Sequence, residues 1–190
     1  MIFLVLTAVW AAPLKPYKID KNHSNIGFAV PILGGLSKVR GKFSDFEIEL
    51  LADEKDITKS TVKARIKAAS IDTGIDARDE HLRTADFFDV EKFPEITFES
   101  RRIIKKGNRN FIARGDLTMH GVTREIDLPF FITGVHKDTK EKSMNIGYAA
   151  RLTLNRRDFG INWTHSVSPD FVGDEIEIEI NLITRLIKTD

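Results

Sequence analysis

The sequence predicts an all-β protein, built as an antiparallel barrel or meander of about eight strands. Hydrophobic and polar residues alternate with a period of two through most of the chain, as in strands with one buried and one solvated face. Hydrophobic residues make up 42% of the 190 residues, enough for a substantial core. Linkers, repeats and low-complexity tracts are not visible in the sequence, so we expect one domain over residues 13–190.

Residues 1–12 differ from the rest of the chain, because they form the uncharged apolar run MIFLVLTAVWAA. Small residues end the run, with Val9 and Ala11 at the −3 and −1 positions of a signal-peptide cleavage site. The run is shorter than the roughly 20 apolar residues that span a bilayer. We therefore expect a signal peptide and a periplasmic or secreted protein that is not integral to the membrane. A buried first strand is the alternative interpretation.

Eight segments carry the alternating pattern of a half-buried strand. Their regular spacing is typical of an antiparallel meander or barrel, and a sheet of this length either packs against another sheet or closes on itself. The expected strands cover residues 26–32, 43–50, 62–68, 96–104, 111–119, 124–132, 146–154 and 176–182.

The segment LTMHGVTREIDL predicts a hairpin whose two-residue loop is His120-Gly121. Glycine accepts a positive φ freely, and histidine does so more often than most residues. This loop sets Phe111 opposite Phe130 on one face. On the other face Arg114 meets Asp127, and this pair of opposite charges supports the register.

A second hairpin is expected at Gly107-Asn108. A two-residue loop there places Phe98 opposite Leu117, so that three adjacent strands share one apolar face. The same register opposes Arg101 to Arg114, which makes it the less secure of the two.

Only the segment from about Ile75 to Phe88 breaks the period of two, and we expect a short helix there. It contains no glycine or proline, and Asp79 and Arg83 are four residues apart, as in a helical ion pair near the positive end of the helix dipole. The helix would cover one end of the barrel with Leu82, Phe87 and Phe88. Its polar side chains would form a rim around the opening: Arg78, Asp79, His81 and Arg83.

Composition and motifs argue against several classes of function. The 29 basic residues are balanced by 28 acidic ones, so the sequence shows no basic excess of the kind that binds nucleic acid. Absence of cysteine excludes disulfides, thiolate nucleophiles and cysteine zinc sites. The five histidines have no metal-ligand spacing, so we expect no metal site.

The sequence also shows no convincing catalytic group. It lacks the Gly-x-Ser-x-Gly turn of a nucleophilic serine, and the neighbours His23 and Ser24 would point to opposite faces of a strand. Asp79 and Glu80 would be about 100° apart on a helix, so they cannot act as paired carboxylates. We therefore expect no catalytic residues and no cofactor.

The barrel interior can be filled or hollow, and the residue pattern alone leaves both open. Thirteen phenylalanines are available to pack a core. A barrel of about eight strands is also near the size that holds one small ligand. Small inward residues would leave room along the axis: Ala64, Ala68, Ala113, Ala150 and Gly115.

Six blocks of the sequence, taken in their order and spacing, resemble the YceI-like family. Together they cover about residues 17–185, and the block at 70–100 is the most distinctive. The matching segments are YKIDKNHSNIGFAV (17–30), VRGKFSDFEIEL (39–50), SIDTGIDARDEHLRTADFFDVEKFPEITFES (70–100), GDLTMHGVTREIDLPF (115–130), LNRRDFGI (154–161) and VGDEIEIEI (172–180).

The resemblance implies an extended, eight-stranded, lipocalin-like barrel with one or two short helices near a barrel end. Its apolar tunnel would bind a polyisoprenoid or a similar long-chain lipid, for transport, storage or sensing in the cell envelope. A homodimer is also implied, whereas catalytic residues are not. An enzyme acting on a lipid tail and a ligand-free interaction module are the alternatives.

We expect the tunnel to be lined by apolar side chains that face inward or cover the barrel end. These residues are Phe28, Val30, Ile66, Leu82, Phe87, Phe88, Phe98, Leu117, Met119, Phe130 and Phe159. The polar rim would then hold the head of the lipid, with its tail buried.

Overall fold

The structure is a computed structural model that describes residues 14–53, 55–138 and 143–186. The expected signal peptide, residues 1–12, lies outside the described residues.

The described chain forms strands, one α-helix and short 3₁₀ turns. The strands are β1 Lys15–Ile19, β2 Asn25–Ile32, β3 Ser37–Phe43, β4 Phe46–Ala52, β5 Thr61–Lys67, β6 Ile71–Asp72, β7 Glu95–Lys105, β8 Asn110–Met119, β9 Val122–Asp138, β10 Ser143–Asn155 and β11 Glu175–Leu186. The helix is α1 Asp76–Arg83, and the 3₁₀ turns are η1 Lys21–His23, η2 Leu33–Gly35, η3 Ile57–Lys59, η4 Ala68–Ser70 and η5 Arg156–Phe159.

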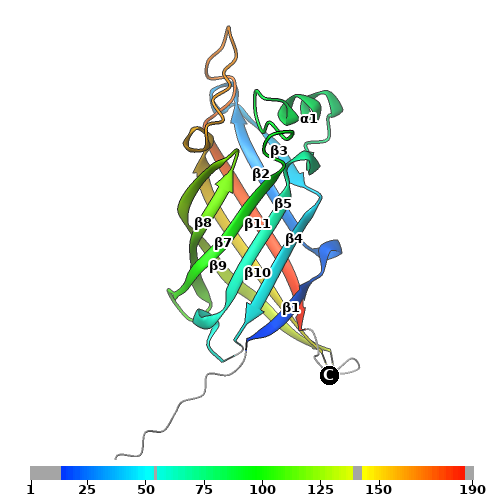
Figure 1. Ribbon diagram of the computed structural model, residues 1–190, viewed down its shortest axis with the longest axis vertical. Helices are drawn as coiled ribbons and strands as arrows, with labels where there is room; N and C mark the ends of the chain where they lie inside the picture. The colour runs from blue at the N-terminus through cyan, green and yellow to red at the C-terminus, as the bar shows by residue number, and fades with distance from the viewer. Residues whose placement is uncertain (1–13, 54, 139–142, 187–190) are drawn as a thin grey trace, which may run out of the picture.

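Eight of these strands close into an antiparallel barrel, as the sequence predicted. The ring runs β1-β4-β5-β7-β8-β9-β10-β11, and β1 closes it by pairing with β11, where Tyr17 is opposite Leu186. Farther along, β11 pairs with β2, which continues the sheet through β3 to β6. Figure 1 shows the elongated barrel with α1 beside β2 and β3 at one end and β1 toward the other. We call the end that carries α1 the helix end, and the opposite end, toward β1, the open-strand end.

The strand predictions need correction in two respects. The expected strand 43–50 starts too early, because Phe43 ends β3 and the strand that follows, β4, begins at Phe46. The two strands run in the same direction but have different neighbours, since β3 pairs with β2 and β6, and β4 pairs with β1 and β5. Strands β1, β3 and β6 were not predicted. The five residues of β1, KPYKI, carry two lysines and a proline and show little alternation.

The predicted β8–β9 hairpin is confirmed in every paired residue. His120 and Gly121 have φ angles of 51° and 74°, the two positive values that this tight turn requires. Arg114 is opposite Asp127 and donates to its carboxylate over 2.5 and 2.7 Å. These hydrogen bonds hold the pKa of the Asp127 carboxyl below its usual value.

The β7–β8 hairpin differs from the prediction near its turn and agrees with it farther away. The loop is longer than Gly107-Asn108, because the backbone N–H groups of Lys106 and Gly107 both donate to the Asn110 carbonyl. A β-bulge between Ser100 and Arg102 then shifts the register by one residue. Phe98 therefore lies opposite Leu117, as expected.

Arg101 is not opposite Arg114, because it occupies this bulge. Its guanidinium contacts Asp116 at 2.8 Å and Glu125 at 3.3 Å. The bulge thus brings Arg102 opposite Arg114 and leaves Arg101 paired with two acids.

The helix is shorter than expected, since α1 ends at Arg83 and not at Phe88. Thr84 stops it: this residue is extended, and its hydroxyl donates to the His81 carbonyl over 2.8 Å. Phe87 and Phe88 follow in a turn segment. The turn keeps both phenylalanines at the helix end of the barrel.

The core lies inside the barrel in two clusters. The larger cluster runs through the middle and the helix end and includes Phe43, Phe98 and Leu117. The smaller one lies at the open-strand end, where Tyr17, Ala52 and Ile146 are buried together.

Candidate ligand tunnel

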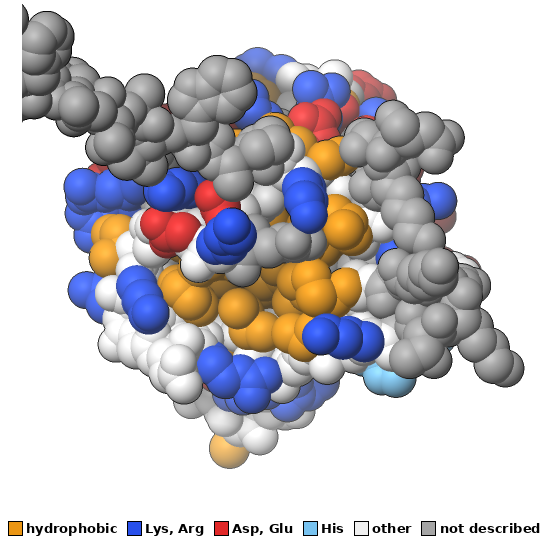
Figure 2. Space-filling view, turned by 90° about the horizontal axis from the view of Figure 1, so that it is seen from below, with side chains coloured by type: hydrophobic (Ala, Val, Ile, Leu, Met, Phe, Trp, Pro, Cys, Tyr) orange, Lys and Arg blue, Asp and Glu red, His pale blue; other side chains and the backbone are white. Residues whose placement is uncertain are grey.

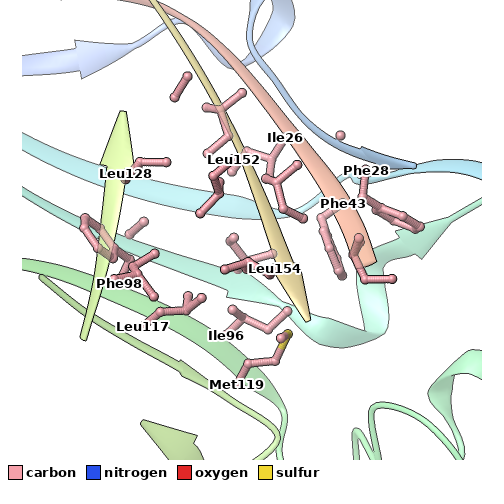
Figure 3. Close-up of a pocket in the computed structure, with 18 of the residues that line it drawn as sticks. Ile26, Phe28, Phe43, Ile96, Phe98, Leu117, Met119, Leu128, Leu152 and Leu154 are labelled. Atoms are coloured by element: carbon pink, nitrogen blue, oxygen red, sulfur yellow. The ribbon is translucent and has the colours of Figure 1, made fainter. Parts of the chain in front are cut away.

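A cavity of about 530 Å³ occupies the barrel interior. All eleven strands contribute side chains to its wall, and Leu82 of α1 closes part of the helix end. Figure 3 shows apolar side chains from β2, β7, β8, β9 and β10 converging on this space. Few lining residues carry a polar group: Ser60, Thr61, Arg78, His81, Tyr148, Arg156 and Trp163.

Most of the apolar residues that the sequence singled out reach the cavity. Those on its wall are Phe28, Val30, Ile66, Leu82, Phe87, Phe88, Phe98, Leu117, Met119 and Phe130. That they contact a ligand stays a prediction.

Phe159 does not line the cavity. It is 2% exposed and packs in the core from the η5 turn. Its prediction was wrong because a 3₁₀ turn does not follow the in-and-out alternation of a strand.

Further lining residues were missed although the same pattern contains them. Leu128, Leu152 and Leu154 lie on predicted strands at inward positions. Trp163 lies in the long segment between η5 and β11, where no periodic signal could have identified it.

The small inward residues have different roles. Ala64, Ala113 and Ala150 do line the cavity. Gly115 does not widen it, because the bulged backbone of β7 occupies the space above this glycine. A Cβ there would lie 2.2 Å from the Glu99 carbonyl oxygen. Ala68 is buried elsewhere in the core, in the η4 turn.

An aromatic cluster covers the helix end. The ring centroid of Phe87 is 5.1 Å from that of His81 and 5.2 Å from that of Trp163, and the His81–Trp163 distance is 5.5 Å. This cluster joins the turn after α1 to the segment that precedes β11. Nearby, Phe88 makes an edge contact with Phe43.

The four residues expected at the polar rim are not equivalent. Arg78 and His81 reach the cavity wall, whereas Asp79 is 5% exposed and does not. Asp79 accepts hydrogen bonds from the Thr73 backbone N–H at 3.0 Å and from the Thr73 hydroxyl. It thereby fixes the loop before α1, so its place at the rim was wrongly predicted.

The expected Asp79–Arg83 pair is also wrong. Arg83 donates instead to the carbonyls of Ala69 and Ile71, at 2.8 and 3.0 Å. The two rim residues that remain are engaged as well, since Arg78 donates to Thr73 and His81 contacts Asp86 at 2.8 Å.

Arg156 is a buried cation that the sequence did not reveal. It is 4% exposed, and it donates to the carbonyls of Ile161 at 2.8 Å and Gly173 at 3.2 Å. Asp174 lies 2.8 Å from its guanidinium. Burial lowers the pKa of Arg156, and Asp174 offsets part of that shift. These contacts anchor the segment that carries Trp163 over the cavity.

The described part of the chain shows neither a cluster of metal ligands nor a helix that could span a membrane. Within residues 14–53, 55–138 and 143–186, no three histidine or acidic side chains lie together as metal ligands would. The helix that the structure describes is too short and too polar to cross a bilayer.

Known proteins are similar to this chain in both sequence and fold. A family model of the YceI-like domain matches residues 17–184. The chain belongs to the YceI-like family. Curated relatives agree with this assignment over most of their length. A UPF0312 protein of Vibrio cholerae is 33% identical over 177 residues, which is 92% of each chain. One from Staphylococcus aureus is 33% identical over 165 residues, covering 86% of this chain and 93% of the relative.

Solved structures share the fold of this YceI-like chain. A Campylobacter jejuni YceI protein superimposes with a TM-score of 0.72 at 29% identity, covering 81% of this chain and 88% of the other. Burkholderia cenocepacia BcnA gives 0.77 at 20% identity, covering 87% and 99%. A polyisoprenoid binding domain from Saccharophagus degradans gives 0.66 at 14% identity, covering 91% and 99%. The last two likenesses concern the fold alone.

Proposed function

We propose that this YceI-like protein binds a long-chain isoprenoid, or a lipid of similar shape, inside the barrel. The observation that carries the proposal is the continuous apolar wall of the cavity, built from all eleven strands. A cavity so poor in polar groups favours a ligand that is mostly hydrocarbon.

The energetics of such a ligand fit the wall. Burial contributes roughly 0.8 kcal/mol per CH₂ group, so a long tail binds well without a polar anchor. The Saccharophagus degradans neighbour, a polyisoprenoid binding domain, has the same fold. That likeness supports the same ligand class here.

The proposal extends to the location and the biological role of the lipid-bound protein. We place the protein in the cell envelope as a homodimer that transports, stores or senses the lipid. Support comes from the apolar run at residues 1–12, which has the form of a signal peptide, and from the cell-envelope role that the family resemblance implies.

The test is native mass spectrometry of the purified protein, followed by solvent extraction of any bound molecule. We expect wild-type protein to carry a long-chain lipid. Leu117→Arg should lose it, because an unpaired charge in the apolar wall is costly. Ile112→Arg is the matched control, since Ile112 is on the same strand with its side chain on the outer face.

The proposal fails if folded wild-type protein retains no lipid when it is offered one. It also fails if the Leu117 variant is folded and keeps the wild-type amount, because the cavity would then not be the binding site.

A further inference from the structure

The open-strand end of the barrel has a surface unlike the rest of the molecule. It is formed by the first residues of β1, β5, β8 and β10 and the last residues of β4, β7, β9 and β11. Figure 2 looks onto this end and shows hydrophobic side chains at its centre, with Lys and Arg side chains spaced around them.

The apolar centre is exposed where burial would be expected. Val135, near the end of β9, is 55% exposed, although it lies opposite the buried Ile146. Leu14 beside β1 is 36% exposed. Met144 and Leu186 pack against the small core cluster and are only half-buried.

Among the side chains that the structure describes, the charges around this centre are mostly positive, although the whole chain has a net charge of only +1. Among the described side chains of this end, the acids are Asp53 and Asp56, both in the β4–β5 connection. Asp53 accepts from two backbone N–H groups of its own loop, and Asp56 pairs with Lys59. The cations are Lys15, Lys55, Lys59, Lys105, Lys106, Arg109, Lys137 and Arg185.

Three of these cations form a group at the β7–β8 loop. Lys105, Lys106 and Arg109 are exposed, and within the described part of the chain none of them has an acidic side chain within ion-pair distance. The β7–β8 loop that carries them lies at the same end of the barrel as the apolar centre. The group is thus available to an outside anion.

We propose that the open-strand end docks on the surface of an anionic lipid bilayer. The apolar centre would enter the boundary between headgroups and acyl chains, and the surrounding cations would contact lipid phosphates. A second copy of the chain fits this end poorly, because two basic collars would face each other. A nucleic acid fits poorly too, since it offers nothing to cover the apolar centre.

This inference goes beyond lipid binding in the cavity, because docking can occur whether the cavity is full or empty. Docking is measured by the fraction of protein that sediments with vesicles. Cavity binding is measured by the lipid that the protein retains. Failure of one therefore does not imply failure of the other.

The experiment compares vesicles of phosphatidylcholine alone with vesicles that also contain phosphatidylglycerol. We expect sedimentation with the anionic vesicles, weakened by salt. The triple variant Lys105→Gln, Lys106→Gln, Arg109→Gln should bind about a hundredfold more weakly, because each cation near an anionic surface contributes about 1 kcal/mol.

The matched control removes three exposed cations elsewhere: Arg40→Gln and Arg65→Gln on the barrel wall, and Lys92→Gln at the helix end. It should bind as wild type does. The proposal is overturned if the two triple variants bind alike, or if wild-type protein ignores anionic vesicles at low salt. A wild-type dimer that dissociates on Val135→Asp, with no vesicle binding, would assign this end to a second copy instead.

Discussion

Tyr148 places a phenol hydroxyl against the apolar cavity, on β10 toward the open-strand end. Among the described residues the hydroxyl oxygen has no hydrogen-bond partner. Burial raises the pKa of Tyr148 to about 12, and the neighbouring Thr184 side chain offsets part of the rise. The neutral form is therefore strongly preferred in the folded protein.

This preference predicts a pH dependence of stability. An unfolded tyrosine ionises near pH 10. Above that pH the unfolded state loses a proton that the folded state keeps, so Tyr148 lowers the free energy of unfolding as pH rises. By pH 11 the loss should be about 1.4 kcal/mol. Urea denaturation of wild type and Tyr148→Phe between about pH 9 and 11 measures it. If the free energy of unfolding falls equally with pH in the two proteins, the hydroxyl of Tyr148 is not buried.

Asp79 shows which single-residue roles the sequence could not reveal. Its spacing from Arg83 is that of a helical ion pair, and its place in a polar run suggested a solvated rim. Its actual partner, Thr73, lies in the loop before the helix. Helical periodicity carries no information about that loop, so the error was unavoidable from pattern alone.

At the scale of elements, the β7–β8 hairpin shows how a partly wrong expectation can place a site correctly. A longer loop moves the register by one residue, and the bulge at Arg101 moves it back. The prediction that Phe98 and Leu117 face inward was therefore correct despite both errors. Alternation fixes which face is buried, whereas loop length and bulges depend on local backbone geometry that the pattern does not encode.

The cover at the helix end can be tested as an element that retains lipid. Phe87→Ala should remove the contact with Trp163 that closes this end, and lipid should then leave several-fold faster. The variant will also be less stable, by about 3 kcal/mol or more, as for a buried phenylalanine. Release rate and melting temperature are therefore measured together.

Phe159→Ala is the control for that loss of stability. Phe159 is buried in the η5 turn, which begins where β10 ends, but it does not line the cavity. If both variants release lipid at the same rate, the cover is a packed plug with no part in retention.

At the scale of the whole molecule, the number of barrel strands was predicted, but not which strands form the ring. The chain alternates clearly in β2, yet β2 lies outside the closed ring. The ring is instead completed by β1, whose inward residues are Tyr17 and Ile19. Ring closure depends on pairing between the two ends of the described chain, and local periodicity cannot specify such a distant contact.

The finite volume of the cavity leads to a prediction about ligand length. The lining is apolar along its course, so each added methylene of a 1-alkanol should strengthen binding by roughly 0.8 kcal/mol, or about fourfold. The gain should stop once the chain fills the cavity, because further methylenes would remain in water. Melting temperature at a fixed ligand concentration reports this, since a ligand that binds only the folded state stabilises it in proportion to RT ln(1 + [L]/Kd). Leu117→Arg should abolish the series. A shift in melting temperature that keeps growing with chain length, or persists in that variant, would place the alkanols on the outer surface, because a cavity of finite volume can bury only a limited length of chain.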